Sequence, residues 1–217
     1  MNYPTDFIDN IICGDSLEIM KSIPDKSIDV ILTDPPYGVG VEYDSFQDTQ
    51  DNLLALIQPM MKEMLRVSKR CALTCGHTNI WKYPEATWIM AWVNSAGNNR
   101  NSWGFTCWQP ILCYGKDPFL ANGMGARQDI IVHNESAPDV KHPVPKPVEF
   151  WKRLLLRVSV KSTDIVLDPF MGSGTTAIVC KETGRHYIGI EISQSYCDIA
   201  KNRLIQSSFE PSLFGNQ

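Results

Sequence analysis

The four residues Asp34-Pro35-Pro36-Tyr37 place an acid, two rigid residues and an aromatic ring directly after the apolar run 30–33. The run predicts a strand, and open α/β sheets bind ligands at the carboxyl ends of their strands. Proline has a fixed φ and no N–H group, so the pair stiffens the backbone and leaves the Pro35 carbonyl free to accept a hydrogen bond. An ordinary Asp-Pro turn would give the aromatic ring no purpose, and we therefore favour a ligand site.

This motif suits methylation of an amino group on a nucleic-acid base. The lone pair of such an amine is delocalised into the ring, so a catalyst must draw it back onto nitrogen. The Asp34 carboxylate and the Pro35 carbonyl could each accept one N–H and aim the lone pair at an incoming methyl group. Tyr37 would stack on the target base once it has flipped out of the duplex, for roughly 1–3 kcal/mol.

A second motif, residues 164–177, reads as a strand, a glycine loop and a helix start (DIVLDPFMGSGTTA). The glycines allow a ligand to approach the backbone, and the helix N-terminus offers free N–H groups. A nucleoside-triphosphate loop would need a lysine after Gly174, which is missing. A dinucleotide fold would accept Gly172, Gly174 and Ala177, with Glu191 on the ribose, so a dinucleotide-dependent oxidoreductase stays open.

The acid before this loop favours S-adenosylmethionine over a dinucleotide. Asp168 would face a pyrophosphate unfavourably but could pair with a sulfonium or an α-ammonium group. Glu191 would then accept the two ribose hydroxyls.

The pattern of the chain predicts strands and helices wound into α/β layers. The expected strands are residues 10–13, 28–33, 71–75, 106–114, 165–168 and 186–191. The expected helices carry apolar stripes at Leu53, Leu54, Leu56, Ile57, Met60, Met61, Met64 and Leu65 and at Phe150, Leu154, Leu155 and Val158, and two more cover residues 175–182 and 194–204. Residues 38–50 lack periodicity and predict a mobile loop.

Composition sets the class of the protein. The 217 residues are 43% hydrophobic and 20% charged, which predicts one soluble domain, residues 1–217. No apolar run approaches the roughly 20 residues of a membrane span and no signal peptide is evident, so we expect a cytoplasmic location and no membrane. The seven cysteines are scattered and predict buried free thiols, and Cys71, Cys75 and His77 match no zinc spacing, so we expect no metal.

Charge argues weakly against a nucleic-acid partner, because the net charge is −4. Basic residues nevertheless gather in the middle third of the chain, between Arg100 and Arg157. The distribution of charge matters more than its sum.

With both motifs described, the chain resembles the DNA amino-methyltransferases, in particular the permuted (beta) group, whose catalytic motif precedes the cofactor loop. Three weaker motifs follow the family's order over nearly the whole chain: residues 14–17 (GDSL), residues 142–147 (HPVPKP), and Gly189-x-Glu191 with Tyr196. The resemblance implies an S-adenosylmethionine-dependent enzyme with a single-domain, Rossmann-like α/β fold: a seven-stranded mixed sheet with helices on both faces. It also implies that DNA binds with the target base flipped, and a role in restriction-modification.

The resemblance also assigns roles to residues. Asp15 would lie on the adenine moiety of the cofactor, and residues 142–147 would lead into a helix that shapes the methionine pocket. Val144-Pro145 replaces a common Thr-Gln, which leaves the roles of His142 and Lys146 open. The expected catalytic residues are Asp34, Pro35, Pro36 and Tyr37, and the expected cofactor-binding residues are Asp15, Asp34, Lys146, Asp168, Pro169, Phe170, Gly172, Ser173, Gly174, Thr175, Thr176, Glu191 and Ile192.

Asp at the head of the motif favours adenine N6, because cytosine-specific relatives more often carry Ser there. Cytosine N4, an RNA substrate and a nucleotide-binding module without catalysis are the alternatives. Family members that read a long site insert a large recognition region, whereas only residues 94–141 are available here. We therefore expect a short or relaxed target, or help from a second copy in a homodimer or from an accessory specificity subunit.

Overall fold

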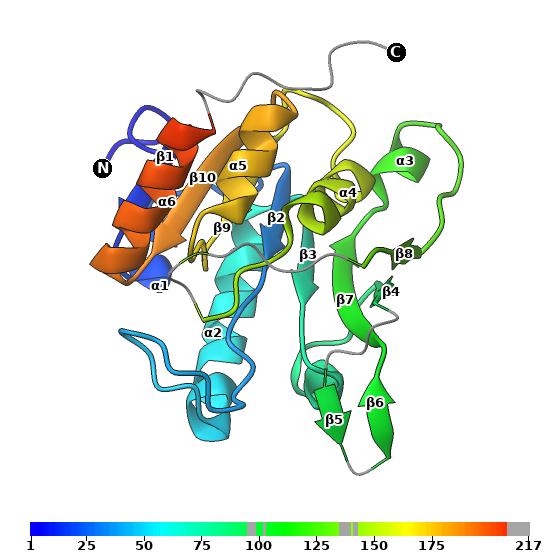
Figure 1. Cartoon of the computed structure of the whole chain (residues 1–217). Helices are drawn as coiled ribbons and strands as arrows, with labels where there is room; N and C mark the ends of the chain where they lie inside the picture. Colours follow the sequence, from blue (N-terminus) through cyan, green and yellow to red (C-terminus); the bar gives the residue numbers. More distant parts are fainter. Residues whose placement is uncertain (95–98, 102, 135–139, 141–142, 208–217) are drawn as a thin grey trace.

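The computed structural model describes residues 1–94, 99–101, 103–134, 140 and 143–207 (Figure 1). The strands are β1 (Asn10–Cys13), β2 (Val30–Thr33), β3 (Arg70–Thr74), β4 (Trp88–Val93), β5 (Asn99–Asn101), β6 (Gly104–Thr106), β7 (Trp108–Gly115), β8 (Ile130–Val132), β9 (Ile165–Asp168) and β10 (His186–Glu191). The helices are α1 (Ser16–Met20), α2 (Gln50–Val67), the 3₁₀ helix η1 (His77–Lys82), α3 (Pro118–Ala121), α4 (Val148–Val158), α5 (Thr175–Glu182) and α6 (Gln194–Gln206).

Eight strands form one mixed sheet in the order β1-β10-β9-β2-β3-β7-β4-β8, and only β7 runs against the others. The predicted α/β sheet is confirmed, with eight strands in place of seven. The additional strand is β8, three residues long, which forms only by pairing with β4 at the sheet edge. Our strand predictions also missed β4 and the separate hairpin β5–β6.

The direction of winding reverses between β9 and β2. From β9 the chain continues to β10 on one side, whereas from β2 it continues to β3 on the other. Loops that follow two such neighbouring strands leave in opposite directions, which opens a crevice at their carboxyl ends. Both predicted motifs start there, because β2 ends at Thr33 and β9 ends at Asp168.

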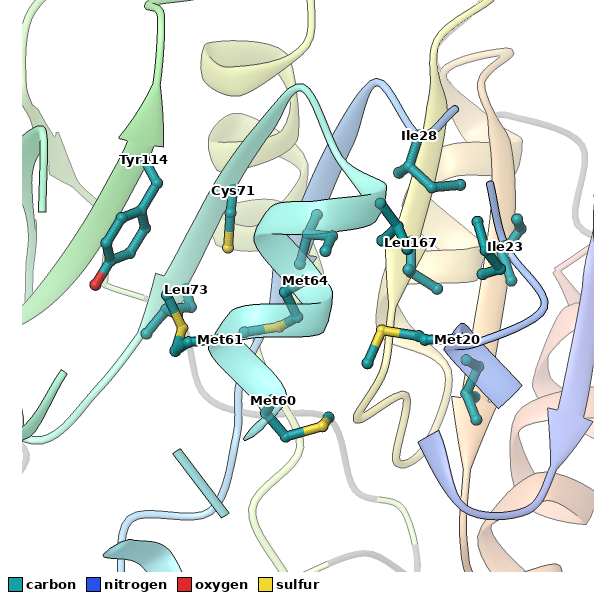
Figure 2. Close-up of a cluster of buried hydrophobic side chains, with 14 of the residues drawn as sticks. Met20, Ile23, Ile28, Met60, Met61, Met64, Cys71, Leu73, Tyr114 and Leu167 are labelled. Carbon is teal, nitrogen blue, oxygen red and sulfur yellow. The ribbon is translucent and has the colours of Figure 1, made fainter. Parts of the chain in front are cut away.

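Helix α2 covers one face of the sheet. Figure 2 shows Met61 of α2 beside the sheet residue Leu73, with Met64 close by. Met60 and Leu167 belong to the same buried cluster. Unbranched methionines fill irregular gaps well, and each large apolar side chain buried here contributes about 1.5–3 kcal/mol. The predicted stripe is confirmed for the buried residues of α2, but Leu54 was wrong, since it is 50% exposed.

Helices α4, α5 and α6 cover the opposite face, in front of the sheet in Figure 1. The predicted stripe of α4 is confirmed, since Phe150, Leu154, Leu155 and Val158 are all buried. Phe150 stacks on Trp92 of β4 with ring centroids 3.9 Å apart. The neighbouring Trp151 donates its indole N–H to the Thr176 hydroxyl at 2.7 Å, which ties α4 to the start of α5.

All seven cysteines are free thiols, although Cys13 and Cys107 are exposed, contrary to the expectation of burial. Within the described residues, no group of three or more His, Cys, Asp or Glu side chains is placed to hold a metal ion. None of the helices in the same part of the chain combines the length and apolar character needed to cross a membrane.

Gly174 fixes the turn between β9 and α5. Its φ of +86° lies in the left-handed region, and a Cβ there would lie 2.8 Å from the Ala200 Cβ and 3.0 Å from the Ala200 Cα on α6. A side chain would therefore strain the backbone and push α6 away.

We predict that Gly174→Ala lowers the free energy of unfolding by about 2–4 kcal/mol, as the sum of left-handed strain and overpacking. The control is Gly184→Ala, because Gly184 has a φ of +72° but only one neighbour, the Ser162 Cβ at 3.9 Å. It should lose about 1–2 kcal/mol. Urea denaturation measures both, and equal losses would show that packing against α6 is unimportant.

Candidate active site

A cavity of about 290 Å³ opens at the carboxyl ends of β9 and β2. Its walls include most of the predicted site residues: Asp15, Asp34, Pro36, Lys146, Asp168, Pro169, Phe170, Gly172, Ser173, Thr175, Thr176, Glu191 and Ile192. Pro35, Tyr37 and Gly174 do not line it. Gly174 instead packs on α6, and Pro35 and Tyr37 lie beside the cavity within the catalytic motif.

The Asp34 carboxylate accepts hydrogen bonds from three side chains. Its Oδ1 accepts from the Tyr37 hydroxyl at 2.6 Å and from the Thr74 hydroxyl, and its Oδ2 is 2.8 Å from the Lys146 ammonium. A carboxylate offers about four lone-pair sites. One site therefore remains for an incoming N–H group, and within the described residues nothing donates to the Pro35 carbonyl.

Lys146 lies beside Asp34 and also 5.4 Å from the centre of the Tyr37 ring. The ion pair is largely buried, with side-chain exposures of 10% for Lys146 and 20% for Asp34. An ammonium in this position forms a charge-assisted hydrogen bond with Asp34 and places a positive charge at the cavity wall. His142, the other uncertain residue of its motif, lies outside the described residues.

Tyr37 is the central residue of the network around Asp34. Its hydroxyl accepts from the Gln109 amide, and its carbonyl accepts from the Asn79 amide at 2.7 Å. Burial, together with the adjacent Asp34 carboxylate, raises the pKa of Tyr37 well above its usual value, so the hydroxyl remains a donor. In the structure the Tyr37 hydroxyl donates to Asp34. For the Tyr37 ring to stack on a base, the hydroxyl would have to give up this hydrogen bond.

Asp168 is buried at the end of β9. Its Oδ1 accepts from Thr33 at 2.6 Å and from the Phe170 N–H at 3.0 Å, and its Oδ2 accepts from Thr176 at 2.5 Å. Burial raises the pKa of Asp168 to about 6, although these donors oppose the shift. The carboxylate thus holds both sides of the glycine loop, at Phe170 and at Thr176. Any contact with a cofactor would be in addition to that role.

Glu191 connects the end of β10 to the same loop. Its two carboxylate oxygens accept from the Gly172 and Ser193 N–H groups, each at 2.8 Å. Burial raises the pKa of Glu191, whereas these backbone donors oppose the shift. Each oxygen keeps a lone pair, so the carboxylate can still accept the hydroxyl pair of a ribose, as predicted.

Asp15 has a structural role as well as the predicted one. Its carboxylate caps α1 by accepting from the Leu17 and Glu18 N–H groups at 2.8 and 3.2 Å. The next residue, Ser16, donates to the Pro169 carbonyl at 2.5 Å. The start of α1 is therefore fixed against the cofactor loop.

Residues 38–49, the latch segment between the catalytic motif and α2, fold over the cavity. Asp48 accepts from the N–H groups of Gly38, Val39 and Val41 at 2.5, 3.0 and 3.1 Å. In the middle of the segment, Asp44 accepts from the Ser193 hydroxyl at 3.1 Å and from the Ser195 hydroxyl. Where composition predicted a mobile loop, the structure shows one held by internal bonds and latched to α6.

Sequence reasoning missed several residues of the site. The latch segment contributes Tyr43, Ser45 and Phe46 to the cavity wall, and the helices contribute Leu56, Met60 and Trp151. Two aromatic residues in a polar segment directly after a catalytic motif were a usable signal. Gln109 could not be found by the rule of carboxyl ends, because it lies at the start of the antiparallel β7, which meets the same edge of the sheet.

The cavity fits S-adenosylmethionine in its chemistry. Acids stand at Asp168 and Glu191, where a charged amino-acid tail and a ribose need partners, and apolar side chains such as Phe46 and Ile192 offer walls for a planar ring. Small-molecule sites generally combine mostly apolar walls with a few placed polar groups.

Comparison with known proteins agrees with this chemistry. A family model described as DNA methylase matches residues 77–202. The chain is 30% identical to the type II methyltransferase M.HpaI of Haemophilus parainfluenzae, over 89% of this chain and 73% of that protein. It is 27% identical to the DNA adenine methyltransferase YhdJ of Escherichia coli (strain K12), over 89% of this chain and 82% of that protein. The crystal structure of the M1.HpyAVI–SAM complex superposes with a TM-score of 0.65 at 25% identity, covering 90% of this chain and 98% of that one.

The burial of Asp168 makes the stability of the protein depend on pH. Its raised pKa means that the folded protein carries the Asp168 proton below about pH 6, whereas the unfolded chain carries it only below about pH 3.8. The free-energy penalty for the buried charge is therefore absent below about pH 4 and complete above about pH 6. The variant Asp168→Asn removes this penalty. The difference between its unfolding free energy and that of the original protein should therefore rise by about 3 kcal/mol in favour of the variant from pH 4 to pH 6, and stay constant above pH 6. Urea titrations across this range test it, and a pH-independent difference would contradict it.

The bonds of Asp44 to Ser193 and Ser195 should slow the release of the cofactor. Asp44→Ala removes an acceptor for two serine hydroxyls, and hydrogen bonds to a charged group are worth about 1.5–3 kcal/mol each. We expect S-adenosylmethionine to dissociate at least tenfold faster, measured by stopped-flow fluorescence. Asp198→Ala is the control, because Asp198 lies on α6 but bonds to Gln194, away from the latch. Equal rates in the two variants would contradict a role for the latch.

Proposed function

The chain belongs to the DNA methylase family and is an S-adenosylmethionine-dependent DNA methyltransferase, and from this premise we propose that it methylates the N6 amino group of adenine. Family membership decides between the two ligand classes that the glycine loop left open, against a dinucleotide. The observation that carries the proposal is the remaining acceptor site of Asp34, at the edge of the cavity and next to the Pro35 carbonyl.

S-adenosylmethionine supplies an electrophilic methyl group when bound. Asp34 and the Pro35 carbonyl each accept one N–H of the target amine, which concentrates the lone pair on nitrogen and turns it toward the cavity. Lys146 donates to Asp34 Oδ2 and holds the carboxylate in place beside the cavity. A C–N bond would form in line as the bond between the methyl carbon and the cofactor's sulfur breaks, and the extra proton on nitrogen would pass to water. None of the cysteines has to form a covalent intermediate.

Adenine is favoured over cytosine by two observations. The motif begins with Asp34, and the relative YhdJ is named as a DNA adenine methyltransferase. We propose further that the target base is flipped toward Asp34, with Tyr37 exchanging its hydrogen bond for a stack on the base.

The setting of the enzyme is part of the same proposal. We propose one catalytic domain over residues 1–217, a cytoplasmic location, and a minimal recognition region in residues 94–141. Because that region is short, we propose a short or relaxed target, or a homodimer or accessory subunit that supplies the missing contacts. The type II methyltransferase M.HpaI supports a role in restriction-modification.

We predict that Asp34→Ala abolishes methylation, with a loss of at least 10²–10³-fold, while the affinity for S-adenosylmethionine stays nearly intact. Activity is measured by incubating unmethylated DNA with labelled cofactor, digesting it to nucleosides and identifying the product by mass spectrometry. The expected product is N6-methyladenine, and N4-methylcytosine would overturn the choice of base.

The matched control is Asp29→Ala. Asp29 is also an ion-paired carboxylate, 2.7 Å from Lys69 and 20% exposed, but it lies outside the proposed recognition region and does not line the cavity. This variant should keep full activity. Parallel loss of cofactor binding and methylation in Asp34→Ala would refute the division of roles.

A further inference from the structure

The hairpin β5–β6 leaves the sheet at the edge where the catalytic motif lies. Strand β4 ends at Val93 and β7 begins at Trp108, and these two residues are paired at the carboxyl edge of the parallel strands. The hairpin lies between them in the sequence and forms its own two-stranded sheet. Figure 1 shows it projecting from the same end of the molecule as the latch segment that follows the catalytic motif.

Two aromatic side chains on this projection are exposed to an unusual degree. Trp103, at the tip, is 99% exposed, and Phe105, on β6, is 69% exposed. Aromatic rings are the side chains that gain most from burial, so neighbouring exposed rings indicate a binding surface. The observation is independent of the family assignment, because it concerns only the solvent exposure of these side chains.

The electrostatics of this segment differ from those of the rest of the chain. Residues 86–116 contain no Asp or Glu, although the chain as a whole has 24 of them, and no other stretch without acids is as long. A projection free of negative charge suits a polyanion. The net charge of −4, which argued against a nucleic-acid partner, is therefore carried elsewhere.

The hairpin is also connected directly to the catalytic residues. From Trp103 the chain runs through β6 and Cys107 into β7, where the Gln109 amide donates to the Tyr37 hydroxyl. An extended chain rises about 3.3 Å per residue, so Phe105 lies at most about 13 Å and Trp103 at most about 20 Å from Gln109. With about 3.4 Å between the bases of a strand, this reach covers roughly four to six base steps beside the target.

We propose that Trp103 and Phe105 form a base-stacking clamp that holds the DNA beside the flipped nucleotide. The inference rests on the proposed function, because flipping one base leaves its neighbours unstacked and accessible to aromatic or apolar side chains. Stacking tolerates any base, since every base has a π-face. The clamp therefore adds affinity for DNA without a large recognition region, which agrees with the short length of residues 94–141.

The test measures DNA affinity directly, by fluorescence anisotropy with a labelled 30-base-pair duplex of mixed sequence in the presence of S-adenosylhomocysteine. Trp103→Ala and Phe105→Ala should each weaken binding roughly tenfold or more. Trp103→Tyr should restore most of the affinity, whereas Trp103→Leu, which is apolar but cannot stack, should not. The dependence of log Kd on log salt should keep its slope in every variant, because no phosphate contact is lost.

Trp88→Ala is the matched control. Trp88 is 58% exposed at the start of β4, and its pairing with Cys113 places it at the opposite edge of the sheet. It should bind DNA like the original protein, and all variants should keep their affinity for S-adenosylmethionine.

Unchanged DNA affinity in Trp103→Ala and Phe105→Ala would overturn the clamp, and so would full affinity in Trp103→Leu. A loss of self-association in these variants, seen by light scattering, with DNA affinity unchanged would show that the rings face a second copy instead. The assay does not depend on which base is methylated. A cytosine product would therefore refute the proposed function and leave the clamp standing.

Discussion

Two carboxylates at the ends of neighbouring strands are the constraint on which the rest of the site depends. Asp34 follows β2 and Asp168 ends β9, and burial, with a smaller contribution from the negative charge of Asp34, raises the pKa of Asp168. Buried like charges destabilise a fold unless donors surround them. Thr33, Thr176 and the Phe170 N–H serve Asp168, whereas Tyr37, Thr74 and Lys146 serve Asp34.

Satisfying these acids brings distant parts of the chain together. Thr74 comes from the end of β3, Lys146 from the segment before α4, and Thr176 from the start of α5. Trp151 on α4 then donates to Thr176, so the hydrophobic layer on that face is fixed to the polar layer above it. The catalytic motif and the glycine loop are therefore parts of one hydrogen-bonded unit, although they lie more than a hundred residues apart in the sequence.

The sequence predicted those parts of the fold whose residues carry their own signal. The bounds of β1, β9, β10 and α5 agree with the structure, because each is a short apolar run ended by an acid or a glycine turn. Strand β4 was missed although its run WIMAWV is also apolar, because no acid or glycine follows it directly to mark its end. Strand β8 was missed because pairing with β4, rather than local preference, creates it.

The site shows the same division between local and tertiary information. Motif spacing located the cavity wall, since Asp34, Asp168 and Glu191 all line it. It could not show that Gly174 packs on α6, or that Asp44 ties the segment after the motif to Ser193 and Ser195. Such contacts join residues of separate elements, and no periodicity within either element encodes them.

Tyr37 joins the cofactor side of the site to the DNA side. Its hydroxyl bonds Asp34 and Gln109, its carbonyl bonds Asn79, and the next residue, Gly38, bonds Asp48 in the latch segment. A hydrogen bond to an ionised acceptor is worth about 1.5–3 kcal/mol, and stacking on a base about 1–3 kcal/mol. The free energy lost with the hydrogen bond is therefore nearly equal to the free energy gained from the stack. In the proposed mechanism the arriving amine takes the acceptor site of Asp34 that is still open, and the Tyr37 hydroxyl leaves its own site when the ring stacks on the base.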